Sequence, residues 1–382
     1  MKVDNLDWSP TTSWGRRTQS VQSCDANLIL YFGPHEHLAD GERHAELRSL
    51  FPDAVILGCS GGSVLDSHVA DDVAVAAVAV SFRHARVSLA TVELDAYATA
   101  EDCGRALVRQ LDAPDLAGIF VLADGTMLNG SALLRGMSDV VRPGIPVSGG
   151  LAGDDARFEE TLVAANAPPR AGIVAALGFY GDSVRLTSGV GGGWTVFGPH
   201  RTISRSDGNV LFELDGEPAL DLYRRYLGDE ADGLPGTALL FPLRVFHPDR
   251  PDHDVVRTVL AIDDATGSMT FAGDVPHGWV AQLMRSTVSR LTAAAATATR
   301  DAVQACGHGD LPGLAIMVNC IGRRLAMGGR YVDETADVLE QLPPAVAQLG
   351  FYSHGEMAAH PGSRTLELHN QTLVVTLVTE IG

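Results

Sequence analysis

LAGIFVLADGTMLNGSALLRGMSDVV, residues 116–141, decides the fold class of this chain, because an apolar run, a loop and a helical pattern follow one another directly. The apolar run predicts a buried strand over 116–125, and SALLRGMSDVV predicts a helix over 131–141. The loop between them is an ordinary strand-to-helix connection that could also hold a ligand. A strand followed by a helix in this way is typical of α/β proteins.

The same alternation extends toward the N-terminus. We expect apolar strands and helices in turn, with strands at 28–32, 54–60, in VAVAAVAV after Asp72 and at 87–94, a helix that ends at Leu50 and another at about 100–111. Alternation of this kind predicts helices that cover a central sheet.

From Thr161 the pattern changes to strand-like segments joined by turns, which is typical of antiparallel sheets. Asp207-Gly208 predicts a hairpin turn, and PALDLYRRYLG (218–228) predicts a helix. Further on we expect strands at 237–246, 258–263, 268–274 and 314–322, and helices at about 277–306 and 334–349. The whole pattern predicts an α/β protein with mixed β-sheets flanked by helices, in two subdomains that face each other.

Composition and charge narrow the functional class. The chain has 28 Lys and Arg against 47 Asp and Glu, a net charge of -19, which disfavours a nucleic-acid or membrane partner. Its five cysteines are scattered without a C-x-x-C pair, so we expect neither a disulfide framework nor a four-cysteine zinc site. The N-terminal stretch lacks the apolar core of a signal peptide, and the most apolar run is too short to span a bilayer. These features predict a cytoplasmic protein.

SGGLAGDD (148–155) contains more glycines than a turn requires. The surplus indicates either tight packing or a ligand brought close to bare backbone. Cys59 and Cys320 each end an apolar strand and run into a glycine turn, and strand ends are where α/β folds place ligands and catalytic groups. The glycine-rich GVGGGW (189–194) does not fit a dinucleotide motif, and neither Ser60 nor Ser148 lies in a G-x-S-x-G nucleophile motif.

Several of these stretches, taken in order, resemble the FIST family of paired FIST-N and FIST-C sensory domains, in its stand-alone bacterial type. They are FPDAVILGCSGG, VSGGLAGDDARFEET and the run from GGGWTVFGPH to DLYRRYLG, then NCIGRR, GFYSHGE and LHNQT. The resemblance implies an N-terminal extension at 1–27, a FIST-N-like α/β domain at 28–217 and a FIST-C-like α/β domain at 218–382.

The chain departs from the family pattern at two of these stretches. In GCSGGSVL, Ser63 and Val64 stand where the family has a glycine and a glutamate. In NCIGRR, Asn319 and Arg324 stand at altered positions. A lost carboxylate and a gained guanidinium would favour an anionic or neutral ligand in any pocket they line.

We expect the ligand in a cleft between the two halves, lined by strand ends and motif loops. The FIST-N-like half would supply Cys59, Ser60, Gly149, Gly150 and Asp154, and the other half Cys320, Arg323 and Glu356. Arg323 could bind a carboxylate or phosphate, and Glu356 an amine. The alternative is that Arg323 and Glu356 pair with each other, or with Asp154, and fasten the halves together.

The resemblance implies a small-ligand-binding sensory protein that signals through a separate effector such as a histidine kinase. One alternative within the family is a haem-binding nitric-oxide sensor, for which His354 and His369 are candidate ligands because they lie in motif stretches. A second alternative is a cysteine-dependent enzyme that uses Cys320, since Arg323 and Arg324 beside it could lower the pKa of the thiol.

Overall fold

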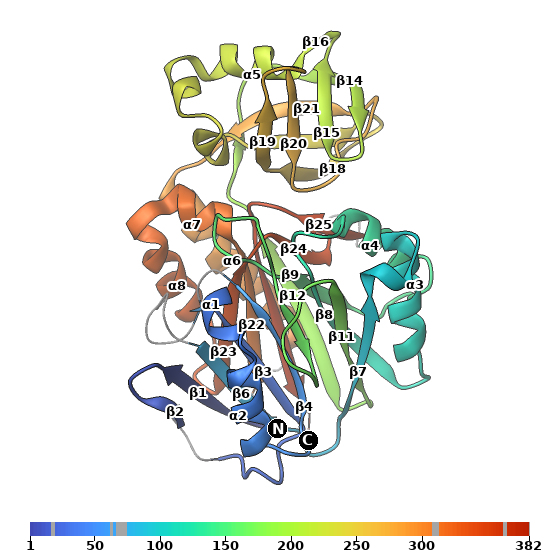
Figure 1. Ribbon diagram of the computed structural model, residues 1–382, viewed down its shortest axis with the longest axis vertical. Coiled ribbons are helices and arrows are strands. Elements are labelled where there is room, and N and C mark those ends of the chain that lie inside the picture. The colour runs from blue at the N-terminus through green and yellow to red at the C-terminus, as the bar shows by residue number, and fades with distance from the viewer. Residues whose placement is uncertain (17–19, 62–63, 66–74, 308–312, 362–364, 382) are drawn as a thin grey trace.

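A computed structural model of the chain shows a large body with a smaller module standing on it (Figure 1). The structure describes residues 1–16, 20–61, 64–65, 75–307, 313–361 and 365–381. The module comprises residues 195–285, and the body is formed by the described residues before and after it. Within the part of the chain that the structure describes, no helix has both the length and the apolar character needed to cross a membrane.

Three sheets build the body. The first has the order β10 (Val163–Ala165), β4 (Val55–Ser60), β3 (Leu28–Gly33), β6 (Val75–Ser81), β1 (Lys2–Ser9) and β2 (Ser13–Arg16). The second has the order β25 (Leu366–His369), β24 (Gly355–Ala359), β9 (Val147–Leu151), β8 (Leu116–Ala123), β11 (Ile173–Tyr180) and β7 (Arg86–Glu93). The third has the order β12 (Val184–Gly191), β26 (Leu373–Glu380), β22 (Gly313–Cys320), β23 (Val346–Ser353) and β5 (Val64–Leu65).

Each of these sheets contains one parallel pair within otherwise antiparallel pairing, namely β3 with β4, β8 with β9 and β22 with β23. Parallel neighbours need a crossover connection, and helices supply it in all three cases. The crossovers are α1 (His35–Leu38) with α2 (Glu42–Leu50), α4 (Gly130–Ser138), and α7 (Ile321–Met327) with α8 (Tyr331–Leu339). The body is therefore three strand–helix–strand units, each completed by antiparallel strands.

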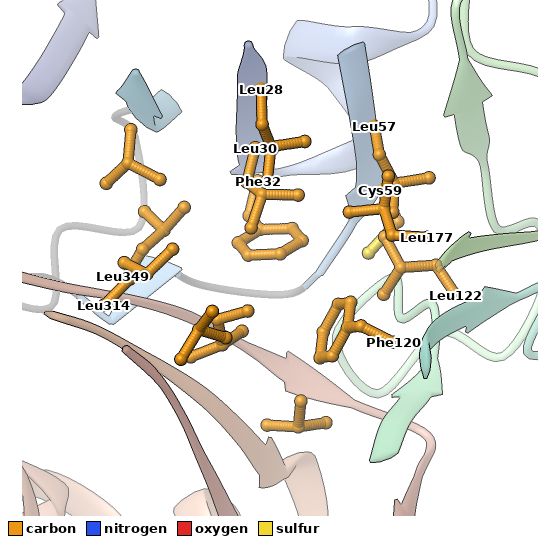
Figure 2. Close-up of a cluster of buried hydrophobic side chains, with 14 of the residues drawn as sticks. Leu28, Leu30, Phe32, Leu57, Cys59, Phe120, Leu122, Leu177, Leu314 and Leu349 are labelled. Carbon is orange, nitrogen blue, oxygen red and sulfur yellow. The ribbon is translucent and has the colours of Figure 1, made fainter. Parts of the chain in front are cut away.

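Apolar faces of the three sheets meet in one shared core. Figure 2 shows Phe32 of β3, Cys59 of β4 and Phe120 of β8 within this cluster, together with Leu314 of β22 and Leu349 of β23. All five side chains are almost fully buried. Two further helices pack on the outside of the sheets, α3 (Ala100–Leu111) beside α4, and α6 (Val288–Cys306) against β12. Because strands from both ends of the chain share this core, it joins the two halves of the sequence.

The module is built on one nine-stranded antiparallel sheet. Its strands are β13 (Thr195–Val196), β14 (Arg201–Asp207), β15 (Val210–Leu214), β16 (Glu217–Pro218), β17 (Leu243–His247), β18 (Arg250–Arg257), β19 (Val259–Asp263), β20 (Ser268–Phe271) and β21 (Val280–Arg285). The helix α5 (Ala219–Leu227) packs on it through Leu220 and Tyr223. The chain enters the module after Gly191 and leaves it before Val288, so two neighbouring crossings connect module and body.

The α/β class with mixed sheets and flanking helices is confirmed, as is the hairpin turn at Asp207-Gly208 between β14 and β15. The expected helix over 277–306 is wrong in its first third. Residues 280–285 form β21, a strand inside the module sheet, and α6 begins only at Val288. Ala281 and Leu283 alternate with more exposed residues along this strand, so tertiary pairing overrides the local helical preference.

Two other expected elements end or begin differently. The helix predicted over 334–349 ends at Leu339, and β23 begins at Val346, because Pro343 and Pro344 cannot continue a helix. The strand predicted over 237–246 starts at Leu243, because a short 3₁₀ helix (Gly236–Leu240) precedes it. The expected strand VAVAAVAV is described from Val75 as β6, and its first residues lie outside the described part.

Two of the three glycines of SGGLAGDD, Gly149 and Gly150, serve packing. Gly149 has a φ of +151°, and a Cβ added to it would lie 1.9 Å from the backbone carbonyl oxygen of Val121. At Gly150 an added Cβ would lie 2.5 Å from the Cγ1 of Val318 in the third sheet. Both positions therefore accept only glycine unless the sheets move. Of the two explanations for the surplus of glycines, tight packing accounts for these two residues.

Gly149→Ala is expected to destabilise the protein by about 3 kcal/mol or more, because the methyl group meets rigid backbone of the neighbouring strand at a φ that L-residues disfavour. Urea unfolding followed by circular dichroism measures the change. Gly329→Ala is the control, because an added Cβ there meets no atom of the described residues within 4 Å, and its effect should stay within about 1 kcal/mol. Equal stability of the two variants would contradict this account of the glycines.

Candidate functional site

A cavity of about 290 Å³ lies between the body and the module, beyond the carboxyl ends of β8 and β9. Strand ends in this position are where open α/β sheets place ligands. The body contributes the loop after β8, the end of β9 and part of the β23–β24 turn, and the module contributes β20 and the residues after it. The lining residues are Gly125, Thr126, Met127, Leu128, Asn129, Gly130, Leu151, Phe158, Asn209, Leu260, Phe271, Ala272, Gly273, His354 and Leu368.

Asp124 shapes the loop that leads from β8 to this cavity. Its buried carboxylate accepts hydrogen bonds from the backbone N–H of Thr126 (2.8 Å), Met127 (3.0 Å) and Gly172 (2.7 Å). The hydroxyl of Thr161 donates to it at 2.9 Å. A carboxylate that collects this many donors locks the loop, so the wall of the cavity is preformed.

His354 forms part of the opposite wall and is held from one side. Its Nε2 lies 3.0 Å from the carbonyl oxygen of Asp155, 3.2 Å from Oδ1 of Asp154 and 3.3 Å from the backbone N of Asp154. Two acceptors, the Asp155 carbonyl and the Asp154 carboxylate, lie closer to Nε2 than the donating backbone N–H of Asp154, so the geometry favours the tautomer with its proton on Nε2. Burial alone would raise the pKa of Asp154, but the hydrogen bonds from His354 and from the backbone of Glu159 and Glu160 hold it far below its usual range.

The Asp154 carboxylate also builds the segment that follows it. Its oxygens accept the backbone N–H groups of Phe158 at 2.9 Å and Glu159 at 2.8 Å. These bonds compensate for the left-handed backbone of Phe158, whose φ is +53°. The ring of Phe158 consequently packs on the His354 ring with centroids 4.4 Å apart, and both rings line the cavity.

The second ring nitrogen of His354, Nδ1, makes no hydrogen bond to the described residues. This nitrogen is buried, and only 5% of the residue is exposed, so water has little access to it. A Cβ built on Gly125, another lining residue, would lie 3.2 Å from this nitrogen. An unpartnered buried polar atom costs on the order of 1–3 kcal/mol, so a polar group that reaches it gains binding energy.

The described residues that line this cavity include no charged side chain. No Asp, Glu, Lys or Arg is among the fifteen described residues that line this cavity, and its polar groups are those of Thr126, Asn129, Asn209 and His354. A charged group buried here would lack a counter-ion, which is costly. The cavity therefore suits an uncharged molecule with an apolar body.

Comparison with known families agrees with this architecture. The model of the FIST N domain matches residues 27–217, and that of the FIST C domain matches residues 219–359. The chain belongs to the FIST family. FIST domains are sensory domains associated with small-ligand binding and signal transduction. No curated protein matches the chain.

In this FIST protein the expected ligand-binding residues Cys59, Ser60, Gly149 and Gly150 are buried in the protein interior. Cys59 lies in the core that the three sheets share, and Ser60 accepts the backbone N–H of Leu162 with its Oγ at 2.9 Å. Gly149 and Gly150 are the packing glycines of β9. None of these four residues is among those that line the 290 Å³ cavity.

Cys320 ends β22 beside Glu356 and is almost fully buried. Burial first, and then the charge of Glu356, raise the pKa of its thiol far above the usual value. The expectation that neighbouring arginines lower this pKa is wrong, because the Arg323 guanidinium serves other partners. A thiol that stays protonated is a poor nucleophile, which argues against the cysteine-dependent enzyme.

Arg323 is fully buried, and protein acceptors use its whole guanidinium. Nε and Nη2 donate to Oε1 of Glu334, Nη1 donates to the carbonyl oxygens of Gly192 and Gln371, and Nη2 also donates to that of Leu291. The guanidinium is thus not available to a ligand. The expected alternative of pairing with Glu356 or Asp154 is wrong as well, because its carboxylate partner is Glu334.

Glu356 is fully buried and central to the motif stretches. It pairs across the sheet with Gly150, accepts the Ser353 hydroxyl at 2.6 Å, and accepts the backbone N–H (3.2 Å) and hydroxyl (2.8 Å) of Thr372. Burial raises its pKa to about 8, against the lowering effect of these hydrogen bonds and of Arg323. The carboxyl group joins β23, β24 and the start of β26, and Glu356 is not among the residues that line the 290 Å³ cavity.

Of the residues that depart from the family pattern, Arg324 is described in the structure and Ser63 is not. Arg324 forms an ion pair with Asp155 at 3.2 Å and lies over the rings of Tyr331 and Tyr352, so its charge does not enter the 290 Å³ cavity. Ser63 lies outside the described residues, and so do the side-chain surroundings of Val64.

The residues described here do not fit haem. His354 binds Asp154 and Asp155 through Nε2 and has Nδ1 close to the Gly125 backbone. The cavity of about 290 Å³ lies at the lower limit for small-molecule sites, about 300 Å³, and is small for a tetrapyrrole. His369 does not line it, and burial and the nearby His360 lower its pKa to about 3.

Sequence reasoning missed most of the cavity lining. The strand–loop–helix pattern indicates the loop 125–130 as a possible ligand loop, and Phe158 and Asn209 lie in motif stretches without being singled out there, but the strand end 271–273 lies in no motif stretch. Leu151 and His354 do lie in the motif stretches, so a search for polar residues around SGGLAGDD and GFYSHGE could have found them.

Arg323→Met is expected to destabilise the protein by about 3–5 kcal/mol, because it leaves the Glu334 carboxylate buried without its cation. Chemical unfolding measures the loss. The control is Arg330→Met, which breaks the exposed pair with Asp333 and should cost about 1 kcal/mol or less. A loss no greater than that of the control would show that the buried pair does not fasten the structure.

Glu356→Gln is expected to change the pH dependence of stability. The pKa of Glu356 is raised in the folded protein, so its contribution is complete below the unfolded value of 4.5 and is lost as the pH rises through about 8. The unfolding free energy of the wild type should therefore fall relative to that of Glu356→Gln between these pH values, by up to about 1.4 kcal/mol for each pH unit. Chemical unfolding at a series of pH values measures the difference.

The control for this pH series is Glu340→Gln, at an exposed position, whose stability should run parallel to that of the wild type. A parallel curve for Glu356→Gln as well would contradict the raised pKa of the buried carboxyl group.

Proposed function

We propose that this protein is a cytoplasmic sensor that binds a small, uncharged molecule with an apolar body in the cavity between body and module. The observation that carries the proposal is the buried Nδ1 of His354, which has no partner among the described residues in a cavity that they line without charged side chains. A hydroxyl or amide N–H of the ligand would donate to this nitrogen. The apolar body would contact Leu151, Phe158 and Phe271.

The position of the cavity suggests how binding becomes a signal. Leu151 and His354 belong to the body, whereas Asn209 and Phe271 belong to the module, so one ligand would contact both parts. A ligand shifts an equilibrium only by its differential affinity for the two states, and a site shared by two parts meets this condition. The ligand would favour one placement of the module, and a separate effector such as a histidine kinase would respond to that placement.

The test is a thermal-shift screen with small alcohols, amides and phenols, followed by calorimetric titration of each hit. A ligand at 100 times its dissociation constant should add about 2.7 kcal/mol of stability. His354→Ala should weaken binding by roughly 10- to 100-fold, because the hydrogen bond to Nδ1 is lost. His277→Ala, which removes an exposed histidine of the module outside the cavity, should leave the affinity unchanged.

Two results would contradict the proposal. One is a wild-type protein that no uncharged compound stabilises. The other is a set of hits that bind His354→Ala as tightly as they bind the wild type, because His354 is the polar group on which the assignment depends.

A further inference from the structure

A second cavity, of about 410 Å³, lies between α4 and the module and shares Leu368 with the first. Its walls come from α4, from β18 and the loop after β20, and from β25. Unlike the first cavity it is lined by arginine, and the sequence predicts none of its residues as a site residue. The side chains that matter for its chemistry are Arg257, Ser131 and the carboxylates around them.

Arg257 is a buried cation without a carboxylate partner among the described residues. Only 3% of it is exposed, and its Nε and Nη1 donate to the carbonyl oxygens of Asp274 (2.8 Å), Val256 (3.2 Å) and Leu368 (2.9 Å). Within the part of the chain that the structure describes, these bonds leave Nη2 without an acceptor. Burial lowers the pKa of Arg257, and the charges of Glu367 and Asp274, which raise it, do not fully compensate.

Ser131 offers a second unused polar group to the same cavity. It is buried, and its Oγ has no hydrogen-bond partner among the described residues. It is the second residue of α4, a nine-residue helix whose amino end carries partial positive charge. Arg257 and Ser131 thus come from the module and the body, and both suit an anion.

Glu367 and Asp274 act on Arg257 through their charge, but neither forms an ion pair with it, and each carboxylate of the cavity has another partner. Asp274 accepts from Nη1 of Arg135 at 2.5 Å and from Nδ2 of Asn129 at 2.7 Å. Further out, the carboxylate of Glu367 lies 2.9 Å from the Nε2 of His253. Asp139 binds Arg105.

We infer that the 410 Å³ cavity binds a small carboxylate with an apolar body, as a second ligand distinct from that of the first cavity. The carboxylate would accept from Nη2 of Arg257 and from the Ser131 hydroxyl. Leu134, Trp279 and Leu366 supply apolar surface for the rest of the molecule. Two donors suit a monoanion, whereas a phosphate dianion requires more.

Calorimetric titration of the full chain with benzoate tests the inference, with benzamide and inorganic phosphate as the neutral and the phosphate probe. Benzoate should bind, and the other two should not. Arg257→Met should weaken benzoate binding by roughly 10- to 100-fold, and Ser131→Ala by roughly 10-fold, because each loses one hydrogen bond to a charged group. His354→Ala should bind benzoate as the wild type does, which separates this site from the first cavity.

Three outcomes would overturn the inference. The wild type could bind neither benzoate nor a second aromatic carboxylate, phenylacetate, or it could bind phosphate and not these carboxylates. The third outcome is that Arg257→Met binds benzoate as tightly as the wild type does. If Arg257→Met does not fold, Ser131→Ala decides, since it removes one hydroxyl and retains the cation. Unchanged benzoate affinity in that variant would then overturn the inference.

Discussion

The buried ion pair of Arg323 and Glu334 is the interaction on which the arrangement of this protein depends. The guanidinium binds the carbonyl oxygen of Gly192, where the chain leaves the body, and that of Leu291, where it has just returned. One cation therefore fixes both crossings between body and module. The two cavities lie along the interface that these crossings position, so their walls depend on a pair that touches neither of them.

The pair also explains why the motif NCIGRR has polar residues at the end of a buried strand. The Nδ2 of Asn319 donates to Glu334 at 2.5 Å, and Arg323 binds the same carboxylate. Removing two charges from water is expensive unless hydrogen bonds satisfy them, and here both sides are satisfied. Asn319 thus stabilises the carboxylate that holds Arg323, a structural role at a position where the family pattern differs.

The pattern of apolar residues along the sequence predicted many of the strands of the body correctly, because these strands are continuous apolar runs that become buried. LILYF became β3, LAGIFVLADG became β8 and LAIMVNCIG became β22. The local pattern gave the wrong prediction at β21, where VAQLMR was expected to be helical but forms a strand paired inside a sheet. Periodicity describes a segment, and the partner that decides between helix and strand lies elsewhere in the chain.

The site was less predictable for the same physical reason. Motif residues such as Arg323 and Glu356 gathered near the centre of the body, but there they bind backbone and side chains of the surrounding strands and helices instead of a cavity. The cavity walls come from segments as distant as Gly125, Phe271 and His354, and their proximity is a property of the assembled sheets. Arg257 lies in the polar strand RPDHDVVR, where nothing in the sequence indicates that its guanidinium becomes buried.

The two cavities are joined by a short polar path, which bears on how a sensor of this shape could work. Asn129 lines the first cavity and donates to Asp274, which lines the second, and Leu368 lines both. Asn129 also caps α4 by accepting the backbone N–H of Ala132 at 3.1 Å. A ligand in either cavity that displaces Asn129 would disturb the start of α4 and the contact to the module together. Coupling between two sites requires a shared element with two arrangements, and the junction of Asn129 with Asp274 is an element that both cavities share.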